Sequence, residues 1–163
     1  MLRLVPMTEA DFHAYCETSS AEYAQEHVRS GRWSAEEAPA LAAREYQELL
    51  PAGVATPNHY LYALHDDATD SDVGRLWFAI REEAGRRSAF VYDVLVFPAF
   101  QRRGYATQAF EALEQQARGL GVTRIGLHVF GHNHGARALY EKLDFVATNI
   151  VMTKSLTDTP SAP

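Results

Sequence analysis

The chain has 163 residues, of which 47% are hydrophobic and 22% are charged, a composition typical of one globular domain. The formal net charge of −6 argues against nucleic-acid binding, because phosphate binding needs concentrated positive charge, and is compatible with a cationic acceptor. No apolar run approaches the ~20 residues of a transmembrane helix, and the N-terminal stretch is too short for a signal peptide, so we expect a cytoplasmic protein with no membrane partner.

The N-terminal part is predicted to form one strand and two helices. Residues 2–5 have the pattern of a short strand. Helices are expected over residues 8–29 and 34–50, and Pro39 should kink the second helix or delay its start. Each helix begins with the spacing of a capping box, Thr8 with Asp11 and Ser34 with Glu37.

A single cysteine, Cys16, lies on the apolar face of the first predicted helix. One cysteine excludes an intrachain disulfide. We interpret Cys16 as a packed core thiol, with a nucleophile as the minor alternative.

The middle of the chain changes to the pattern of strands. Strands are predicted over residues 59–65, 73–81 and 89–97, with polar or glycine-containing turns between them. Short connections of this kind favour antiparallel hairpins. The third strand is the most apolar.

The C-terminal part alternates helix and strand. A helix is predicted from Gly104 to Gly121, followed by a strand over 124–130, a helix over 133–143 and a last strand over 145–154. The order β-α-α-β-β-β-α-β-α-β predicts an α/β fold with a mixed sheet covered by helices. We expect one domain over residues 1–156 and a mobile tail over 157–163.

The most informative stretch is the buried strand 94–97, the proline turn after it and the loop that opens the next helix. Such a helix start offers unpaired N–H groups and the positive end of a dipole, which together favour an anion. Gly104 and Ala106 leave the backbone uncovered, so that a phosphate can approach. On spacing alone, an ordinary strand-to-helix turn is equally compatible with the pattern.

The loop Gln101-Arg102-Arg103-Gly104-Tyr105-Ala106 resembles the Gln/Arg-x-x-Gly-x-Gly/Ala signature of the GNAT superfamily of N-acetyltransferases. A second block also resembles a conserved block of this family: Asn133…Ala136…Leu139-Tyr140-Glu141-Lys142-Leu143…Phe145. The two blocks follow each other in the order and at the distance that the family shows. The resemblance is clear from about Val73 to Lys154. Two departures are present: Asp144 stands where the family usually has glycine, and Leu95 where it often has a glutamate base.

The resemblance implies the GNAT fold, acetyl-CoA as co-substrate and transfer of its acetyl group to a primary amine by direct attack in a ternary complex. It implies that the cofactor-binding residues are Leu95 and Val96 on the strand, the loop residues Gln101, Arg102, Arg103, Gly104, Tyr105, Ala106 and Thr107, and Asn133. The N–H of Val96 could also stabilise the tetrahedral intermediate. Asn133 opens a helix and is expected to cap it as well.

Tyr140 is implied as the acid that protonates the departing thiolate, although without the resemblance a core tyrosine would be the better interpretation. Asp93 shares the strand face of Leu95 and is a candidate base for the amine. A structural carboxylate that caps a loop or pairs with an arginine explains Asp93 equally well.

Three histidines, His128, His132 and His134, lie close together in the sequence. No cysteine or carboxylate completes a metal site there, so we expect no metal and interpret them as surface and loop histidines. A proton relay through His128 is the less favoured alternative.

Two functions compete with amine acetylation. The first is a catalytically weak acyl-CoA-binding regulatory module, favoured by Leu95 and disfavoured by Tyr140. The second is a non-catalytic interaction domain, which leaves the phosphate loop without a role. The acceptor, a small molecule or a protein amine, is not identified by any motif. A homodimer is expected from the apolar last strand, which offers an edge for pairing.

Overall fold

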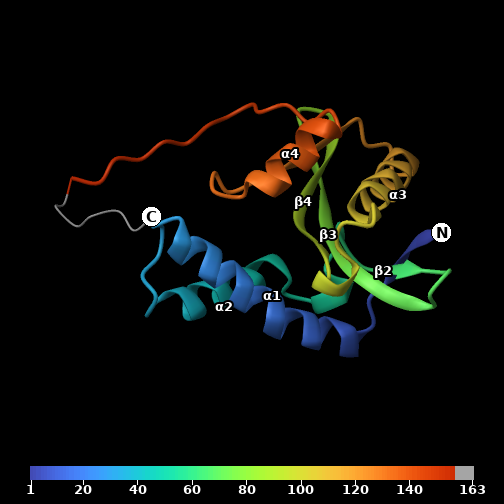
Figure 1. The fold of residues 1–163 in the computed structure, drawn as a ribbon, viewed down its shortest axis with the longest axis horizontal. Coiled ribbons are helices and arrows are strands. Elements are labelled where there is room, and N and C mark those ends of the chain that lie inside the picture. Colours follow the sequence, from blue (N-terminus) through green and yellow to red (C-terminus); the bar gives the residue numbers. More distant parts are fainter. Residues whose placement is uncertain (157–163) are drawn as a thin grey trace.

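A computed structural model describes residues 1–156. The chain forms a five-stranded sheet in the order β1-β2-β3-β4-β5, covered by helices on both faces. The strands are β1 (Leu2–Pro6), β2 (His59–Asp66), β3 (Ser71–Glu83), β4 (Arg86–Val96) and β5 (Arg124–Leu127). The helices are α1 (Glu9–Arg29), α2 (Ala38–Leu49), α3 (Tyr105–Gly119) and α4 (His134–Lys142). The predicted mixed α/β fold is confirmed (Figure 1).

The first four strands pair antiparallel and β5 joins β4 in parallel. The two predicted hairpins are therefore confirmed. The parallel pair needs a crossover, and α3 provides it (Figure 1).

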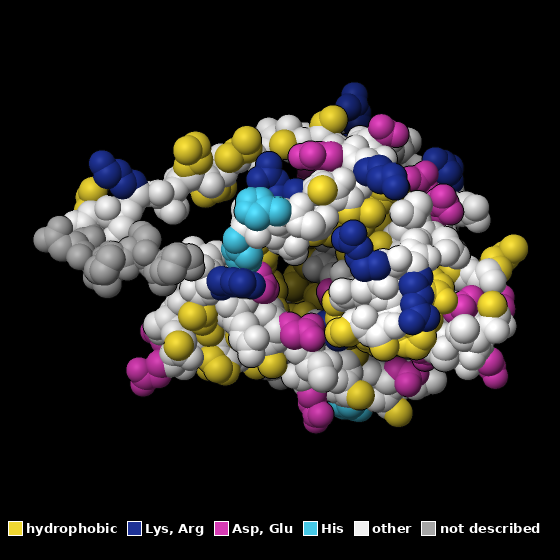
Figure 2. All heavy atoms as spheres, in the orientation of Figure 1, with side chains coloured by type: hydrophobic (Ala, Val, Ile, Leu, Met, Phe, Trp, Pro, Cys, Tyr) yellow, Lys and Arg dark blue, Asp and Glu magenta, His cyan; other side chains and the backbone are white. Residues whose placement is uncertain are grey.

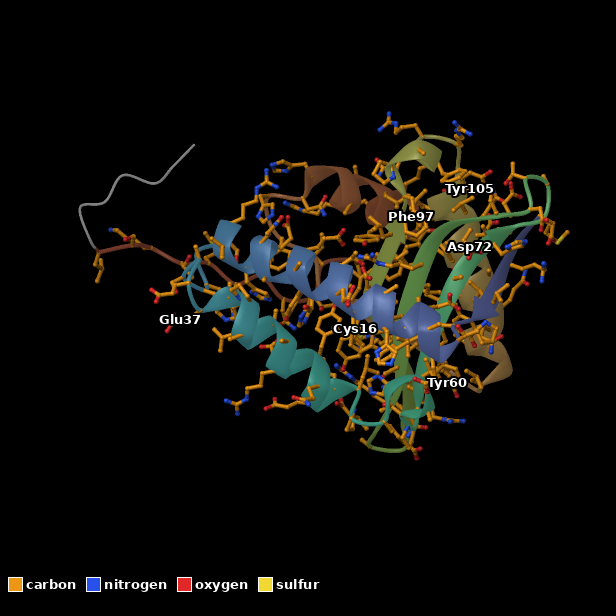
Figure 3. All side chains as sticks on the ribbon, turned by 90° about the horizontal axis from the view of Figure 1, so that it is seen from below. Cys16, Glu37, Tyr60, Asp72, Phe97 and Tyr105 are labelled. Atoms are coloured by element: carbon orange, nitrogen blue, oxygen red, sulfur yellow. The ribbon has the colours of Figure 1, made fainter. Side chains whose placement is uncertain are left out.

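Helices α3 and α4 cover one face of the sheet, and α1 and α2 cover the other. Phe110 and Leu113 of α3 are fully buried against Leu64, Leu76 and other residues of β2 and β3. On the opposite face, Trp77 packs with residues of α1 and of the loop after α2, among them Tyr15 and Leu50. Figure 3 shows α1 and α2 lying side by side across that face.

The first N-terminal helix begins as the sequence predicts, and the second begins later than predicted. The capping box of α1 is present, with Thr8 and Asp11 bonded reciprocally. Ser34 and Glu37 also bond to each other, but α2 begins only at Ala38, because Pro39 occupies the first turn. Pro39 therefore delays the helix, one of the two effects expected of it.

Cys16 of α1 is half-buried beside the core formed by Trp77 (Figure 3). Burial raises the pKa of its thiol, which keeps the group protonated. The interpretation as a packed thiol is confirmed.

The predicted last strand over residues 145–154 is wrong for this structure, in which residues 145–156 form no strand. After α4 the chain leaves the body of the molecule as an extended arm (Figure 1). A strand needs a neighbour to receive its backbone hydrogen bonds, and none lies beside this segment in the described residues. The preceding strand is also shorter than predicted, since β5 ends at Leu127 and not at residue 130. The expected tail over 157–163 lies outside the described residues.

Two backbone features shape the middle of the sheet. Trp77 pairs with Asp93 and Phe78 pairs with Val91, so Tyr92 is an extra residue, a β-bulge in β4. A Cβ added to Gly74 would lie 2.2 Å from the carbonyl oxygen of Leu95, so β3 and the end of β4 approach at a distance that only glycine permits.

His27, at the end of α1, is buried inside an aromatic cluster. Its ring lies 4.2 Å from that of Trp33, 4.4 Å from that of Tyr23 and 5.2 Å from that of Phe130. Both ring nitrogens are buried without a hydrogen-bond partner among the described residues. Burial lowers the pKa of His27 below its ordinary value of 6.5, with the charge of Arg32 as a second cause.

This burial predicts an acid-sensitive contribution to stability. Below about pH 6.5 the unfolded chain takes up a proton at position 27 that the folded chain resists, so stability falls as the pH falls towards the folded pKa. We expect His27→Phe, which keeps a ring and removes both unpaired nitrogens, to gain about 1 kcal/mol or more at pH 5 and less at pH 7.5. Urea unfolding at both pH values measures this, and an equal difference at the two values would contradict it.

Candidate functional site

The site lies where β4 and β5 separate. The two strands pair from Ser88 with Arg124 to Val91 with Leu127, and their pairing stops there. Strand β4 continues to Val96 and remains paired with β3. The inner edge of residues 92–96 is therefore left open towards β5.

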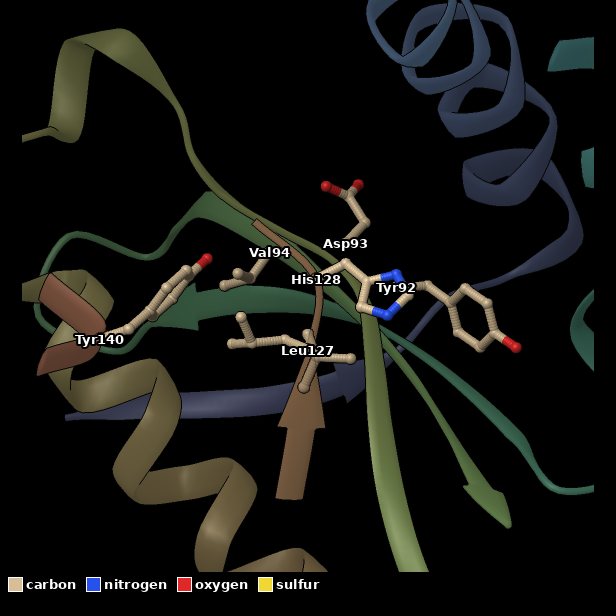
Figure 4. Close-up of a pocket in the computed structure, with 7 residues that line it drawn as sticks. Tyr92, Asp93, Val94, Leu127, His128 and Tyr140 are labelled. Carbon is tan, nitrogen blue, oxygen red and sulfur yellow. The ribbon is translucent and has the colours of Figure 1, made fainter. Parts of the chain in front are cut away.

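A cavity occupies this opening (Figure 4). It is lined by β4, by the end of β5 and by one residue of α4: Val91, Tyr92, Asp93, Val94, Leu127, His128 and Tyr140. Val91 and Val94 belong to the face covered by α3. Because of the bulge, the adjacent Tyr92 and Asp93 both turn to the face covered by α1, where they contact Trp77 and Tyr15. The cavity is thus lined by residues whose side chains belong to the two faces of the sheet.

Tyr140 projects from α4 into this cavity, its hydroxyl towards the opening (Figure 4). The ring packs against Phe110 and Phe145, with centroids 5.6 and 5.7 Å apart. No described residue hydrogen-bonds the hydroxyl. Burial raises the pKa of Tyr140, and the charge of Asp93 raises it further, so the phenol keeps its proton at neutral pH. The arrangement suits a proton donor.

The carboxylate of Asp93 accepts hydrogen bonds from β3 and from helix α1. One of its oxygens, Oδ2, accepts hydrogen bonds from Arg75 Nε (2.8 Å), Tyr15 Oη (3.1 Å) and Ser19 Oγ (3.3 Å). Arg75 also forms an ion pair with Glu22 of α1. Asp93 therefore pairs with an arginine, as the structural interpretation of this residue expects. Its role as a base stays a prediction, since the same side chain also lines the cavity.

The end of β4 carries Leu95 and Val96. Phe97 donates its N–H to the carbonyl of Val73 on β3, at 2.9 Å. Backbone groups alternate direction along an antiparallel ladder, so the N–H of Val96 points to the other edge, into the opening. The side chain of Gln101 donates to the carbonyl of Val96 at 2.9 Å and holds the turn after the strand.

The loop before α3 leaves the helix N-terminus uncovered. Gly104 is the N-cap with φ +84°, and no side chain caps the helix. Arg102 also has a positive φ of 64°. A Cβ on Gly104 would meet nothing within 4 Å, so the space before the helix is open to a ligand. Free N–H groups at an open helix start fit a phosphate.

Tyr105, the first residue of α3, anchors this loop. Its hydroxyl donates to Asp66 at 2.8 Å, and Asp66 also accepts from Thr69 and from the backbone of Ala68. The loop that begins at Phe97 thus lies beside the turn after β2, and Figure 3 shows Phe97 and Tyr105 at the same end of the sheet. The side chains of Ala106 and Thr107 are half-buried at the start of the helix, and Arg103 lies over the ring of Phe100.

Asn133 accepts from the N–H of Ala136 at 3.1 Å, so the predicted capping of α4 is confirmed. Asp144 adopts φ +63°, the left-handed conformation that glycine would take and that aspartate tolerates.

The three histidines do not converge. His128 lines the cavity, His132 contacts Glu26 of α1, and His134 begins α4. Residues 1–156 contain no group of His, Cys, Asp and Glu able to hold a metal ion.

The network around Asp93 was not predicted from the sequence. Arg75 lies in an apolar strand pattern, and a buried arginine in such a pattern signals a buried carboxylate partner. The bulge at Tyr92 leaves no clear signal in the sequence.

No helix among residues 1–156 is long and apolar enough to cross a bilayer.

Comparison with known proteins identifies the family of this chain. The sequence model of the Acetyltransferase (GNAT) family matches residues 14–145. The uncharacterized N-acetyltransferase YycN of Bacillus subtilis is 39% identical over 155 residues, which are 95% of this chain and 99% of YycN. The crystal structure of YycN has a TM-score of 0.92 and covers 97% of this chain and 100% of its own.

More distant relatives carry the same domain. The mycothiol acetyltransferase of Beutenbergia cavernae is 28% identical over 144 residues, which are 88% of this chain and 44% of that protein. A Pyrococcus furiosus structure, 20% identical with a TM-score of 0.72, covers 96% of this chain and 100% of its own and shares the fold. The extent of the family match and the identity to YycN establish that this chain belongs to the GNAT family of acetyltransferases.

Proposed function

We propose that this acetyltransferase moves the acetyl group of acetyl-CoA to a primary amine by direct attack in a ternary complex. The observation that carries the proposal is the cavity between β4 and β5, which is lined by residues of both faces of the sheet. A thioester entering beside α3 and α4 and an amine entering beside α1 can meet there. Direct attack needs such a meeting and no covalent enzyme intermediate.

The described residues fit coenzyme A at two places. The uncapped start of α3, with open space beside Gly104, favours the negative charge of a pyrophosphate. The open inner edge at Val96 offers backbone groups to the amide-containing arm, whereas those of Leu95 point towards β3. Arg102 and Arg103 are exposed beside the loop and supply positive charge. Asn133 keeps its amide N–H₂ free of the bond that caps α4.

The reaction converts an ammonium and a thioester into an amide, a thiol and one proton. The amine must first lose a proton, because an ammonium has no electron pair for the attack. The nitrogen then bonds to the carbonyl carbon, and the N–H of Val96 is placed to donate to the oxyanion. The carbon–sulfur bond breaks, and Tyr140 donates its proton to the thiolate. The second proton that the nitrogen loses on becoming an amide restores the phenol of Tyr140.

The acceptor side carries negative charge. Glu22 and Glu26 of α1 and Asp93 of β4 all lie on this side. Within residues 1–156, Arg75 and Arg29 are the permanent cations that pair with them. Such a surface attracts an ammonium group. We infer a cationic amine as the acceptor and a cytoplasmic location, where acetyl-CoA is available.

A regulatory module that binds acyl-CoA without rapid turnover remains the second candidate. The observation that favours it is the pairing of Asp93 with Arg75, with Leu95 in place of a glutamate base. Thiol release from acetyl-CoA across a panel of amines, with coenzyme A affinity from calorimetry, separates the two. Tight binding with no release for any amine would favour the module.

The phosphate loop predicts a specific loss of affinity in Gly104→Val. The branched side chain would cover the open helix start and also strain a residue with φ +84°. We expect the coenzyme A affinity to fall about tenfold or more, because the loss of one hydrogen bond to a charged group has an effect of this size. Gly85→Val is the matched control, because Gly85 also has a positive φ of 73° and open space but lies in the β3–β4 turn. Equal affinities in the two variants would overturn this site.

The acid role of Tyr140 predicts a loss of turnover in Tyr140→Phe. The ring and its packing on Phe110 are kept and only the proton donor is removed. We expect kcat to fall by a factor of about 10² to 10⁴, with coenzyme A affinity close to wild type. Tyr62→Phe removes a hydroxyl from the same core, where it accepts a hydrogen bond from Gln116, and should leave kcat unchanged. A kcat within a factor of about two of wild type in Tyr140→Phe would show that water supplies the proton, if chemistry limits the rate.

The two interpretations of Asp93 predict different pH profiles. If Asp93 accepts the proton of the amine, Asp93→Asn lowers kcat/KM and alters its acidic limb. Tyr15→Phe is the control, because it removes one hydrogen bond to Asp93 and keeps the carboxylate. We expect the pH profile to change in the first variant alone. Lower thermal stability with an unchanged profile would assign Asp93 to structure only.

A further inference from the structure

Three aromatic rings continue from the cavity along the sheet face that α1 partly covers. Phe90 and Tyr92 of β4 both lie on this face, with ring centroids 5.0 Å apart. His128 of β5 stands perpendicular to the ring of Phe90, at a centroid distance of 5.1 Å. Tyr92 and His128 also line the cavity, and Figure 4 shows both extending away from Tyr140. The rings of Phe90, Tyr92 and His128 together form an aromatic strip that begins at the cavity.

The neighbours of Phe90 on the two adjoining strands are small. Its partners in the sheet are Ala79 of β3 and Gly126 of β5. A Cβ added to Gly126 would lie 4.0 Å from the ring of Phe90, and Gly126 does not have a positive φ. Neither a close contact nor the backbone conformation therefore demands glycine at this position. Its effect is to leave one side of the ring uncovered, as glycines in strands do where a ligand approaches.

A cation lies at the far end of the aromatic strip. The guanidinium of Arg81 lies 4.0 Å from the centre of the Phe90 ring and donates a hydrogen bond to the hydroxyl of Tyr92 at 2.9 Å. The side chain of Arg81 is exposed, and no carboxylate within residues 1–156 forms an ion pair with it. A guanidinium has five N–H donors in a planar fork, so Arg81 keeps donors for the two oxygens of a carboxylate.

The opposite end of the aromatic strip is acidic. Asp93 lines the cavity, and Arg75 links it to Glu22 of α1. Figure 2 shows acidic side chains at the rim of the hollow between α1 and α4. Asp93 follows Phe90 by three residues in β4, and a strand rises by about 3.3 Å per residue. The acidic end and the cation over Phe90 are therefore roughly 10 Å apart.

We propose that the aromatic strip binds the body of the acceptor and that Arg81 binds a carboxylate at the acceptor's far end. This inference rests on the proposed function and names its substrate class. The acceptor is an amine with a carboxylate roughly 10 Å from the nitrogen, the span of a medium-chain amino acid or of an extended tripeptide. The acidic end of the site attracts the ammonium, the rings contact the body, and Arg81 fixes the orientation.

Calorimetry on the full chain with coenzyme A present tests the role of Arg81. Aminooctanoate carries its two charges roughly this far apart when extended, and aminooctanamide lacks the negative charge. Arg81→Gln should lower the ratio of acid to amide affinity about fivefold, the upper end for an exposed ion pair. Arg86→Gln removes the same charge from the exposed start of β4 and should leave the ratio unchanged.

Three outcomes of this measurement would overturn the carboxylate site. The first is an unchanged ratio of affinities in Arg81→Gln. The second is an equal fall of the ratio in Arg86→Gln, which would show a general effect of charge. The third is a wild-type protein that does not bind aminooctanoate.

Gly126→Leu tests the aromatic strip itself. The leucine would cover the open side of Phe90, and the ordinary backbone conformation of Gly126 should let the variant fold. We expect weaker binding of aminooctanoate, with coenzyme A affinity close to wild type. Unchanged binding of aminooctanoate would contradict the assignment of the aromatic strip.

These measurements separate the acceptor site from the proposed function, because calorimetry does not depend on turnover. A protein that binds aminooctanoate through Arg81 but acetylates no amine would refute the proposed function and leave the site standing. Acetylation of amines with no contribution from Arg81 to binding would keep the function and refute the site.

Discussion

The ion pair between Arg75 and Asp93 joins the two parts of the molecule on which the site depends. Arg75 lies on β3 and Asp93 on β4, and both are bonded to residues of α1. Removing one partner of a buried pair typically costs about 3–5 kcal/mol, because the other charge is left without compensation. The helical layer that bounds the acceptor side is thus fixed to the strand that bounds the cavity.

The carboxylate of Asp93 also affects the pKa of three tyrosines. Its charge is among the causes that raise the pKa of Tyr15, of Tyr46 (to about 12) and of Tyr140, after burial in each case. Tyr15 uses its proton to bond Asp93, and Tyr46 contacts Ser19, so both are engaged within the network. Tyr140 lies on the other face and has no such partner. Burial, with the charge of Asp93 as a second cause, raises the pKa of all three phenols, and of the three only Tyr140 lines the cavity.

The sequence predicted those features that depend on local patterns. The capping boxes, the hairpins and the glycine before α3 each follow from a few neighbouring residues. The site also required contacts between distant segments, and these were not predicted. Gly74 is required by the carbonyl of Leu95, Arg75 by Asp93, and the bulge at Tyr92 by the register of two strands. Asp93 could be placed on the correct face from the sequence, but its three partners could not.

The predicted strand after α4 failed for a related reason. Strand propensity describes how a segment fits a pleated surface, and it does not supply the neighbour that completes the hydrogen bonds. Residues 145–154 have the required composition, yet in one copy of the chain they have no edge beside them. Helices differ in this respect, because all their backbone bonds lie within the segment, and α4 was accordingly predicted almost to the residue.

The short pairing of β5 with β4 explains both the presence of the cavity and the weak support of the strand that bounds it. The opening exists because β4 and β5 stop pairing at Val91 and Leu127, which frees the backbone of β4 for a ligand. The same interruption leaves β5 with four paired residues on its inner side and none on its outer side within residues 1–156. A longer inner pairing would fix β5 but close the cavity. Packing of Ile125 and Leu127 on the core below the sheet therefore supports this wall without closing the opening.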